Sequence, residues 1–440
     1  MTPETEVWWL REAGALDEPP APALRQPLEA DVAIVGGGYV GLWTALGIKT
    51  RAPDTRVALV ERARSGFGPS GRNGGFLHGY WSMLPWLRET LGAPDALRLA
   101  RAGDAILPAV RELEADVWLR EGGMLEVATT PEQERALGHA VDVAAELGVP
   151  EEAVLLSREE VRVRCGSSRF RGGVYFRECA TVQPARLVRA LRARALAAGV
   201  ELYEQTPALR VRSGVVETPA ANIRASSVVL ATNAALAGWR GTARRIAAFR
   251  SYVVLTEPIP DAIAELGWTG GEAIADGRMF LHYFRTTADG RILMGSAGGS
   301  QRHAERGLRL LFPTLRDARI THHWGGPIDV SADRLPLVGE RGGIRYAAGF
   351  TGNGVGPSWL AAQALASRVL GLDDEWSALP LVDRDVPALP PDPLKRLGGA
   401  LVRNSVLALE EADEEGRRAP LLARAGAQLP RLARSRIGLR

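Results

Sequence analysis

Three glycines in the segment VGGGYVG have the spacing of a loop that binds the phosphates of a dinucleotide. Gly36, Gly38 and Gly41 form the pattern G-x-G-x-x-G. The first glycine permits a tight turn, the second lets the backbone approach a pyrophosphate, and the third allows a helix to pack closely on a strand. Glu61 follows Gly41 by twenty residues, where an acid accepts a hydrogen bond from a ribose hydroxyl. Because an acid there disfavours a 2′-phosphate, the pattern predicts a site for FAD or NAD rather than NADP.

The residues around this loop predict the elements that must hold it. The apolar run 31–35 is typical of a buried parallel strand, the segment after GGGYVG to about residue 51 of a helix, and residues 57–61 of a second buried strand. Together they form a βαβ unit, in which the N-terminus of the helix and its dipole face the phosphates.

Other segments extend this unit. Residues 62–80 are glycine-rich and non-periodic, and a loop of this length in a compact domain is usually functional. A second glycine-rich turn, TGNGVGPS, lies near residue 350 and is followed by a helix to about residue 370. A buried strand over 225–234 ends near Ala231 and Thr232, which we expect close to the ribose or the pyrophosphate.

The region 249–295 has strand character instead. Asp289-Gly290 is a strong turn signal and predicts an antiparallel hairpin between MFLHYFR and RILMG. Residues 300–320 are expected to be helical, and the segment WGGPIDVSADRLPLVGE is expected to be a loop.

Composition excludes several classes of protein. The 440 residues carry a net charge of +3, and the basic excess lies in residues 391–440, which hold ten basic and six acidic residues. A nucleic-acid enzyme would carry its basic patch on the working domain, so we expect no nucleic-acid partner. No run of 18 apolar residues and no signal peptide are present, which predicts a cytoplasmic protein without stable membrane insertion. Cys165 and Cys179 are too few for a disulfide framework.

The ordered motifs VGGGYVGLWTAL, PSGRNGG, TVQPARLVRAL, VVLATNA, HYFRTTADGRILMG, SADRLPLVG and GFTGNGVGPS resemble the D-amino-acid-oxidase-type (glycine/sarcosine oxidase) family of FAD-dependent oxidoreductases. Within that family the chain is most similar to γ-glutamylputrescine oxidase-like proteins. The resemblance implies an α/β fold, in which a Rossmann-type FAD-binding domain is interleaved with an α+β substrate domain built on an antiparallel sheet. We expect an N-terminal arm over 1–30, an FAD-binding domain over 31–84, 151–240 and 325–375, a substrate domain over 85–150 and 241–324, and a helical tail over 376–440.

The resemblance also assigns residues to FAD. The first glycine-rich loop is expected to line the flavin through Ser70, Arg72, Asn73, Gly74 and Gly75. The second turn approaches the flavin from the other end through Gly352, Asn353, Gly354 and Val355, and the main chain of Ala208 is expected to meet the adenine.

The mode of flavin attachment follows from the same comparison. Some relatives link flavin through a cysteine in the C-terminal half, but both cysteines here precede residue 180, so we expect non-covalent FAD. Some relatives also use a lysine over the flavin to activate oxygen. Lys49 and Lys395 are the only lysines, and neither is placed for that role. Dioxygen and another electron acceptor therefore both stay open.

The reaction implied by the resemblance is oxidation of a C–N bond in an amine or amino acid, with a hydride passing to flavin N5 and the imine hydrolysing. We assign Tyr283, Arg285 and Asn353 to catalysis, with Arg285 as a clamp for an anionic group. The alternative is a flavoprotein of the same fold that oxidises a C–O bond, as in a 2-hydroxy acid.

The substrate side of the site is expected to include Tyr252, His282 and Trp324. In the strand MFLHYFR, His282 shares a face with Phe284 and Tyr283 shares the other with Arg285, so only one pair can face the substrate. We favour Tyr283 and Arg285. The pair of histidines before Trp324 lacks a third ligand at suitable spacing, so no metal site is predicted. Arg334 is interpreted as structural, and the protein as a monomer or small homo-oligomer.

Overall fold

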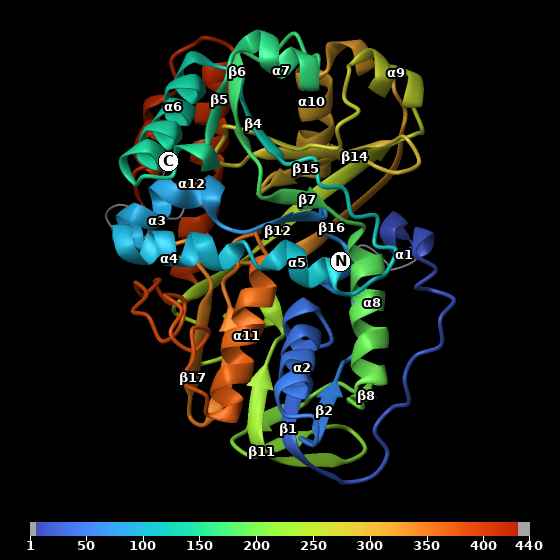
Figure 1. The fold of residues 1–440 in the computed structure, drawn as a ribbon. Coiled ribbons are helices and arrows are strands. Elements are labelled where there is room, and N and C mark those ends of the chain that lie inside the picture. The colour runs from blue at the N-terminus through green and yellow to red at the C-terminus, as the bar shows by residue number, and fades with distance from the viewer. Residues whose placement is uncertain (1–5, 430–440) are drawn as a thin grey trace.

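The fold is described from a computed structural model, which describes residues 6–429. Two large sheets divide the molecule into a lower and an upper half (Figure 1). The lower sheet runs in the order β17 (Leu337–Arg341), β18 (Ile344–Ala348), β11 (Asn222–Leu230), β1 (Leu28–Val35), β2 (Val57–Val60) and β8 (Glu201–Tyr203), with β10 (Val215–Glu217) and β9 (Arg210–Arg212) added at β11. Strands β18, β11, β1, β2 and β8 are parallel, as expected for a doubly wound nucleotide-binding sheet.

Helices cover the lower sheet on the face seen in Figure 1. Helix α2 (Tyr39–Arg51) packs between α11 (Pro357–Leu370) and α8 (Pro184–Ala197). Val32 and Ile34 of β1 join the apolar core beneath these helices, whereas Ala33 and Val35 join the core on the opposite face. Strand β1 is thus buried on both faces, which explains its continuous apolar run.

The upper sheet forms the second half. Its order is β16 (Ile320–Ser331), β12 (Ile246–Thr256), β15 (Ile292–Ala297), β14 (His282–Thr286), β13 (Ala273–Asp276), β4 (Met124–Ala128), β6 (Gly172–Phe176) and β5 (Val154–Leu156). All of its pairings are antiparallel except β13 with β4. The hairpin expected at Asp289-Gly290 joins β14 to β15. A small sheet of β3 (Phe76–His78) and β7 (Cys179–Thr181) lies between the halves.

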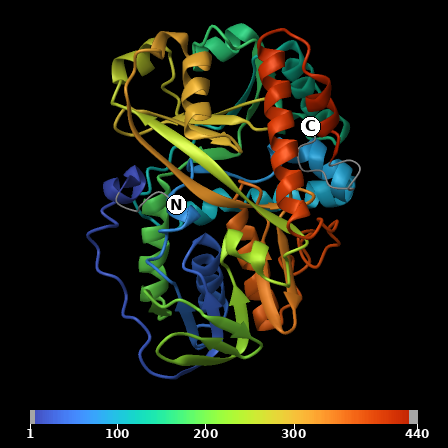
Figure 2. The ribbon, with the colours of Figure 1, turned by 180° about the vertical axis from the view of Figure 1, so that it is seen from behind.

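The remaining helices surround this frame. They are α1 (Trp8–Glu12), α3 (Leu84–Leu91), α4 (Ala93–Gly103), α5 (Ile106–Arg111), α6 (Pro131–Glu146), α7 (Arg158–Arg164), α9 (Pro260–Glu265), α10 (Gln301–Leu311), α12 (Leu394–Glu414) and α13 (Leu421–Gly426). Figure 2 shows α12 running along the back of the upper half. None of the helices in residues 6–429 is long and apolar enough to cross a membrane.

The structure differs from the sequence-based expectations in three places. Within the segment 324–340 only residues 332–336 lack strand structure, because residues 324–331 belong to β16, which pairs with β12, and residues 337–340 belong to β17. The helix expected over 300–320 ends at Leu311, just before Pro313. The expected FAD-binding segment 151–240 is divided, because β5 and β6 pair in the upper sheet.

Candidate active site

The first glycine-rich turn joins β1 to α2. The amide N–H of Gly36 donates to Val60 O (2.9 Å), and Gly38 is the N-cap of α2. A Cβ at Gly41 would collide with the carbonyl oxygen of Gly36, so only glycine allows the helix to start this close to the strand. The carboxylate of Glu61 accepts hydrogen bonds from the amides of Gly37 (2.8 Å) and Ala63 (3.0 Å) at the end of β2.

The end of β11 lies beside this turn. The amide of Ala231 donates to Val35 O (2.9 Å), and a Cβ on Gly36 would lie 2.5 Å from Ala231 O and 3.5 Å from Thr232 Cγ2. Ala208 lies between β8 and β9, half-buried against the apolar core on the face of the sheet away from α2. The structure therefore brings Ala231 and Thr232 to the turn, and leaves the assignment of Ala208 to adenine as a prediction.

The second loop, residues 70–75, is held by its own side chains. Ser70 Oγ accepts a hydrogen bond from the amide of Tyr39 (3.1 Å), which ties the loop to the first turn of α2. Asn73 Nδ2 donates to Pro69 O (3.1 Å) and Ser70 O (2.9 Å), while its Oδ1 accepts from the amide of Gly75 (2.8 Å). The polar atoms of Asn73 thus hold the loop in shape.

The N-terminal arm covers the same loop. Trp9 is fully buried, and its indole N–H donates to Asn73 O (3.0 Å). Gln183 Nε2 in turn donates to Trp9 O (2.8 Å). Trp8 and Trp9 thus pack on the body, and the arm positions the loop.

The turn before α11 depends on Asp329, a residue that the sequence analysis did not identify. The buried carboxylate of Asp329 accepts hydrogen bonds from the amides of Gly349 (2.5 Å) and Phe350 (3.2 Å) and from Asn233 Nδ2 (3.0 Å). Burial raises the pKa of Asp329 to about 6 against the effect of these donors. Asp329 therefore connects the turn 349–356 to the segment that follows β11.

Asn353 and its neighbours form the tip of this turn. Asn353 Nδ2 donates to Gly79 O (3.3 Å), so the turn leans on the segment after β3. Gly352 is exposed, and a Cβ there would meet nothing within 4 Å. Gly354 is half-buried and Val355 is buried at the start of α11. The turn thus presents Gly352 to open space while Asn353 holds it in place.

One face of the upper sheet lies over the loop 70–75. Residues that are paired across adjacent strands project on the same face of a sheet. The register therefore places on one face a row that we call the roof row: Glu126, Ala275, Tyr283, Gly295, Val253 and Trp324. This row crosses six strands, and two of its side chains contact the loop.

Tyr283 and Trp324 contact the loop directly. A Cβ on Gly74 would lie 2.7 Å from Tyr283 Cε2, and the hydroxyl of Tyr283 is 2.9 Å from Ser251 Oγ. Burial raises the pKa of Tyr283 to about 12, so its hydroxyl is protonated at neutral pH. The indole N–H of Trp324 donates to Arg72 O (2.8 Å). Both side chains therefore border the predicted flavin loop.

Arg285 lies on the same face but binds backbone. Its Nη1 donates to Val182 O (2.6 Å) and Gly75 O (3.5 Å), and its Nε donates to Thr286 O (3.0 Å). Burial lowers the pKa of Arg285 to about 9, and nearby Arg120 adds to the shift. In this arrangement Arg285 positions the loop through its carbonyls. Its Nη2 is buried without a hydrogen-bond partner in residues 6–429, and its role as an anion clamp stays a prediction.

The structure does not bring Tyr252 and His282 to this face. Both residues pair with Ser296, so they project on the opposite side of the sheet from Tyr283. The ring of His282 stacks on His303 of α10 at 4.9 Å, and Asp276 Oδ2 lies 2.9 Å from its Nδ1. The expectation that Tyr252 and His282 line the substrate site together with Tyr283 is therefore corrected.

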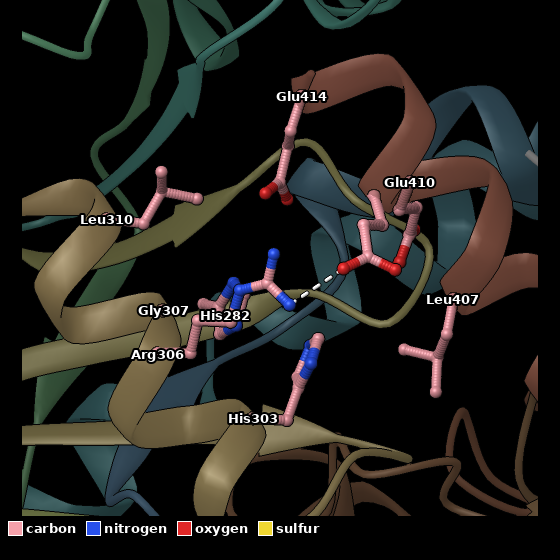
Figure 3. Close-up of a pocket in the computed structure, with 9 residues that line it drawn as sticks. His282, His303, Arg306, Gly307, Leu310, Leu407, Glu410 and Glu414 are labelled. Carbon is pink, nitrogen blue, oxygen red and sulfur yellow. Dashed lines mark hydrogen bonds and ion pairs between the residues drawn. The ribbon is translucent and has the colours of Figure 1, made fainter. Parts of the chain in front are cut away.

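His282 instead borders the tail helix. Figure 3 shows His282 and His303 on one side of a small cavity of about 80 Å³, with Glu410 and Glu414 of α12 on the other. Arg278 forms ion pairs with Asp276 and Glu414, and Glu410 accepts from the amide of Met279 (2.6 Å). Glu410 and Glu414 of the tail's acidic run thus face the body.

Two charged residues at the end of the roof row were not assigned to the site from the sequence. Glu126 of β4 is half-buried, and burial raises its pKa to about 7 while Arg334 lowers it. The guanidinium of Arg334 lies 5.1 Å from the centre of the Trp86 ring, and its backbone has φ +68°. The alternation in GGMLEVA, which places Glu126 opposite Leu125 and Val127, is the signal that could have identified Glu126.

The residues present fit an FAD. The two glycine turns and the loop 70–75 converge with backbone amides and small residues, as a pyrophosphate and a ring system require. Asn233 Oδ1 and Asn353 Oδ1 are buried without a hydrogen-bond partner in residues 6–429, so both can accept from a bound group.

The two lysines and two cysteines do not contribute a reactive group to the predicted flavin loop. Lys49 Nζ donates to Thr55 O (3.1 Å) and Pro53 O, and Lys395 Nζ donates to Ala243 O (2.7 Å), so both amines are engaged away from the loop. Cys165 and Cys179 are buried free thiols. The described part of the chain holds no group of three or more metal-ligating side chains arranged for an ion.

Comparison with known proteins agrees with this geometry. Residues 31–368 match the family model "DAO: FAD dependent oxidoreductase". The probable oxidoreductase OrdL of Rhizobium meliloti is 30% identical over 421 residues, which cover 90% of this chain and 94% of that protein. The gamma-glutamylputrescine oxidoreductase of Escherichia coli is 26% identical over 397 residues, covering 86% and 92%. The crystal structure of glycine oxidase from Geobacillus kaustophilus has a TM-score of 0.66 at 24% identity, covering 79% of this chain and 96% of that one. The chain therefore belongs to the DAO family of FAD-dependent oxidoreductases.

Proposed function

We propose that this enzyme binds FAD without a covalent link and oxidises the C–N bond of a small amine or amino acid. The observation that carries the proposal is the roof row, whose Tyr283 and Trp324 lie directly against the loop 70–75 that is expected to line the flavin. The bound flavin would supply the two-electron acceptor for a hydride that leaves the carbon next to the amine. The resulting imine then hydrolyses to a carbonyl compound and an amine.

The chain's own residues divide the work of holding the cofactor. Gly36, Gly38 and Gly41 would receive the pyrophosphate at the start of α2, and Glu61 the ribose. The loop 70–75 would line the flavin, and the turn carrying Gly352, Gly354 and Val355 would meet it from α11. Backbone groups dominate these contacts, so rigidity of the two loops matters more than any one side chain.

The roof row supplies positioning rather than a strong base. Tyr283 keeps its proton at neutral pH and binds Ser251, while Trp324 is anchored on Arg72 O. Oxidation by hydride loss requires mainly that the amine is neutral and its C–H is aimed at the acceptor. A site that fixes orientation by an aromatic wall and a hydrogen-bonded hydroxyl meets this requirement.

The names of the relatives support the substrate class. One relative is a gamma-glutamylputrescine oxidoreductase, and similar folds occur in a glycine oxidase and an L-proline dehydrogenase from P. horikoshii. Each of these names refers to a compound with an amino or imino nitrogen. Oxidation at C–N is therefore favoured over oxidation at C–O.

The test is an anaerobic flavin-bleaching screen on the purified holoenzyme. Loss of the visible flavin absorbance with amines or amino acids, and not with 2-hydroxy acids, is the expected result. Bleaching only with 2-hydroxy acids would overturn the proposal. Repeating the screen in air identifies the acceptor, and acid precipitation that leaves all flavin in the supernatant establishes non-covalent binding.

A further inference from the structure

Glu126 is the acidic member of the roof row. Its partners in register are Val174 of β6 and Ala275 of β13, and Ala275 pairs in turn with Tyr283. Glu126 therefore lies two strands from Tyr283 on the same face, at a separation of about 10 Å for a strand spacing of about 4.8 Å. Neighbouring Leu125 and Val127 point the other way, into the apolar core beneath α10.

The carboxyl of Glu126 has no hydrogen-bond donor of its own. Arg334 acts on it electrostatically, and no residue in the described range 6–429 donates a hydrogen bond to it. Because no described residue donates to it, the half-buried carboxyl is open to a hydrogen bond from a ligand in place of water. Burial, and to a smaller extent Asp276 on the neighbouring strand, raise the pKa of Glu126 to about 7, while Arg334 lowers it.

We propose that Glu126 binds a charged ammonium group of the substrate that is separate from the reacting amine. The inference rests on the proposed function and names its substrate class as amines with a second, cationic amino group. The reacting amine must be neutral, so it is not the group that a carboxylate would hold. A charged ammonium in contact with Glu126 supplies the missing donor in the form of a charge-assisted hydrogen bond.

The distance along the roof row suits such a substrate. The roof row places Glu126 about 10 Å from Tyr283, which lies against Gly74, so the Glu126 side chain and a short aliphatic diamine can together span this separation. Arg334 beside Glu126 would repel a cation, but the ring of Trp86 lies against its guanidinium and fixes it to one side. The pair can therefore also accept a substrate whose cationic end carries a carboxylate.

The experiment compares 1,4-diaminobutane with 1-aminopentane, which replaces one ammonium by a methyl group. The holoenzyme is reduced beforehand under anaerobic conditions, so no amine can be oxidised and calorimetry reports binding alone. In the wild-type enzyme we expect the diamine to bind about 10- to 100-fold more tightly, as one charge-assisted hydrogen bond allows. In Glu126→Gln the diamine and the monoamine are expected to bind about equally, and Glu126→Asp should recover part of the preference for the diamine.

A matched control is Glu132→Gln on α6, an exposed acid paired with Arg135. This variant should keep the wild-type preference. An equal preference in wild type and Glu126→Gln, or no preference in wild type, overturns the inference. The bleaching screen is scored separately, so failure of every amine to reduce the oxidised flavin contradicts the proposed function, whereas bleaching without a diamine preference contradicts the Glu126 subsite alone.

Discussion

Gly75 provides the sharpest test of how the flavin loop is built. Its backbone has φ +73°, a region that costs an alanine about 1–2 kcal/mol. A Cβ there would collide with Val182 O and lie 2.8 Å from Arg285 Nη1. Gly75→Ala must therefore move the loop, and the hydrogen bonds from Gly75 N to Asn73 Oδ1 and from Val182 N to Gly75 O, both 2.8 Å, would be strained or lost.

The expected magnitude follows from these contacts. Two buried hydrogen bonds at about 1 kcal/mol each, added to the backbone cost, give about 3 kcal/mol. If the loop returns to its original shape only when FAD binds, this energy is subtracted from binding, and the dissociation constant rises about 100-fold. The assay is a titration of the apoprotein with FAD, in which binding is measured from the quenching of flavin fluorescence.

Gly68→Ala in the same loop is the matched control. Gly68 has φ −79°, and a Cβ there would meet nothing within 4 Å, so this change should leave FAD affinity within about twofold of wild type. Equal FAD affinity in Gly75→Ala and Gly68→Ala would refute the assignment of this loop to the flavin.

Three further predictions concern other parts of the site. Trp9→Ala removes a buried ring and the donor to Asn73 O, so we expect a loss of about 3–5 kcal/mol in the free energy of unfolding, measured by urea denaturation. A loss below about 1 kcal/mol would show that the arm does not hold the loop. The pKa of Asp329 is raised from 3.8 to about 6, so its contribution to stability is present below pH 4 and lost as pH rises through 6. The free energy of unfolding of Asp329→Asn should therefore rise by roughly 2–3 kcal/mol relative to that of wild type between pH 4 and 7. A difference between the two proteins that does not change with pH would contradict the shift. Because both lysine amines are bound to carbonyls elsewhere, the double variant Lys49→Arg, Lys395→Arg should reoxidise in air at the wild-type rate, and a tenfold slower rate would place a lysine in the oxygen reaction.

Features set by neighbouring residues could be predicted from the sequence. The βαβ unit around Gly36 and Glu61 and the hairpin at Asp289-Gly290 appear where the local patterns placed them. Each depends on a backbone conformation or an alternation within a few residues. The region after Trp324 was misread for the same reason, since two glycines and a proline favour a loop locally but pairing with β12 makes it a strand.

Features set by contacts between distant segments could not be predicted. Asp329 is separated by 20 residues from Gly349 and by 96 from Asn233, and no local pattern marks it as their common acceptor. Tyr252 was misplaced because its face depends on the register of β12 against β15, which a one-residue shift would reverse. Glu126 could not be placed for the same reason, because its position on the face of Tyr283 requires two successive pairings, β4 with β13 and β13 with β14.

The pleat of β14 explains why adjacent residues have unrelated surroundings. Tyr283 projects toward the flavin loop, while His282 projects toward α10 and the tail. Between β13 and β14 the chain turns through Arg278, whose ion pairs with Asp276 and Glu414 join that turn to α12. The tail therefore fixes the turn that sets the register of Ala275 against Tyr283. Since the same register places Glu126 two strands from Tyr283 on one face, the C-terminal helix supports the geometry of the roof row from the opposite face, without contributing a side chain to it.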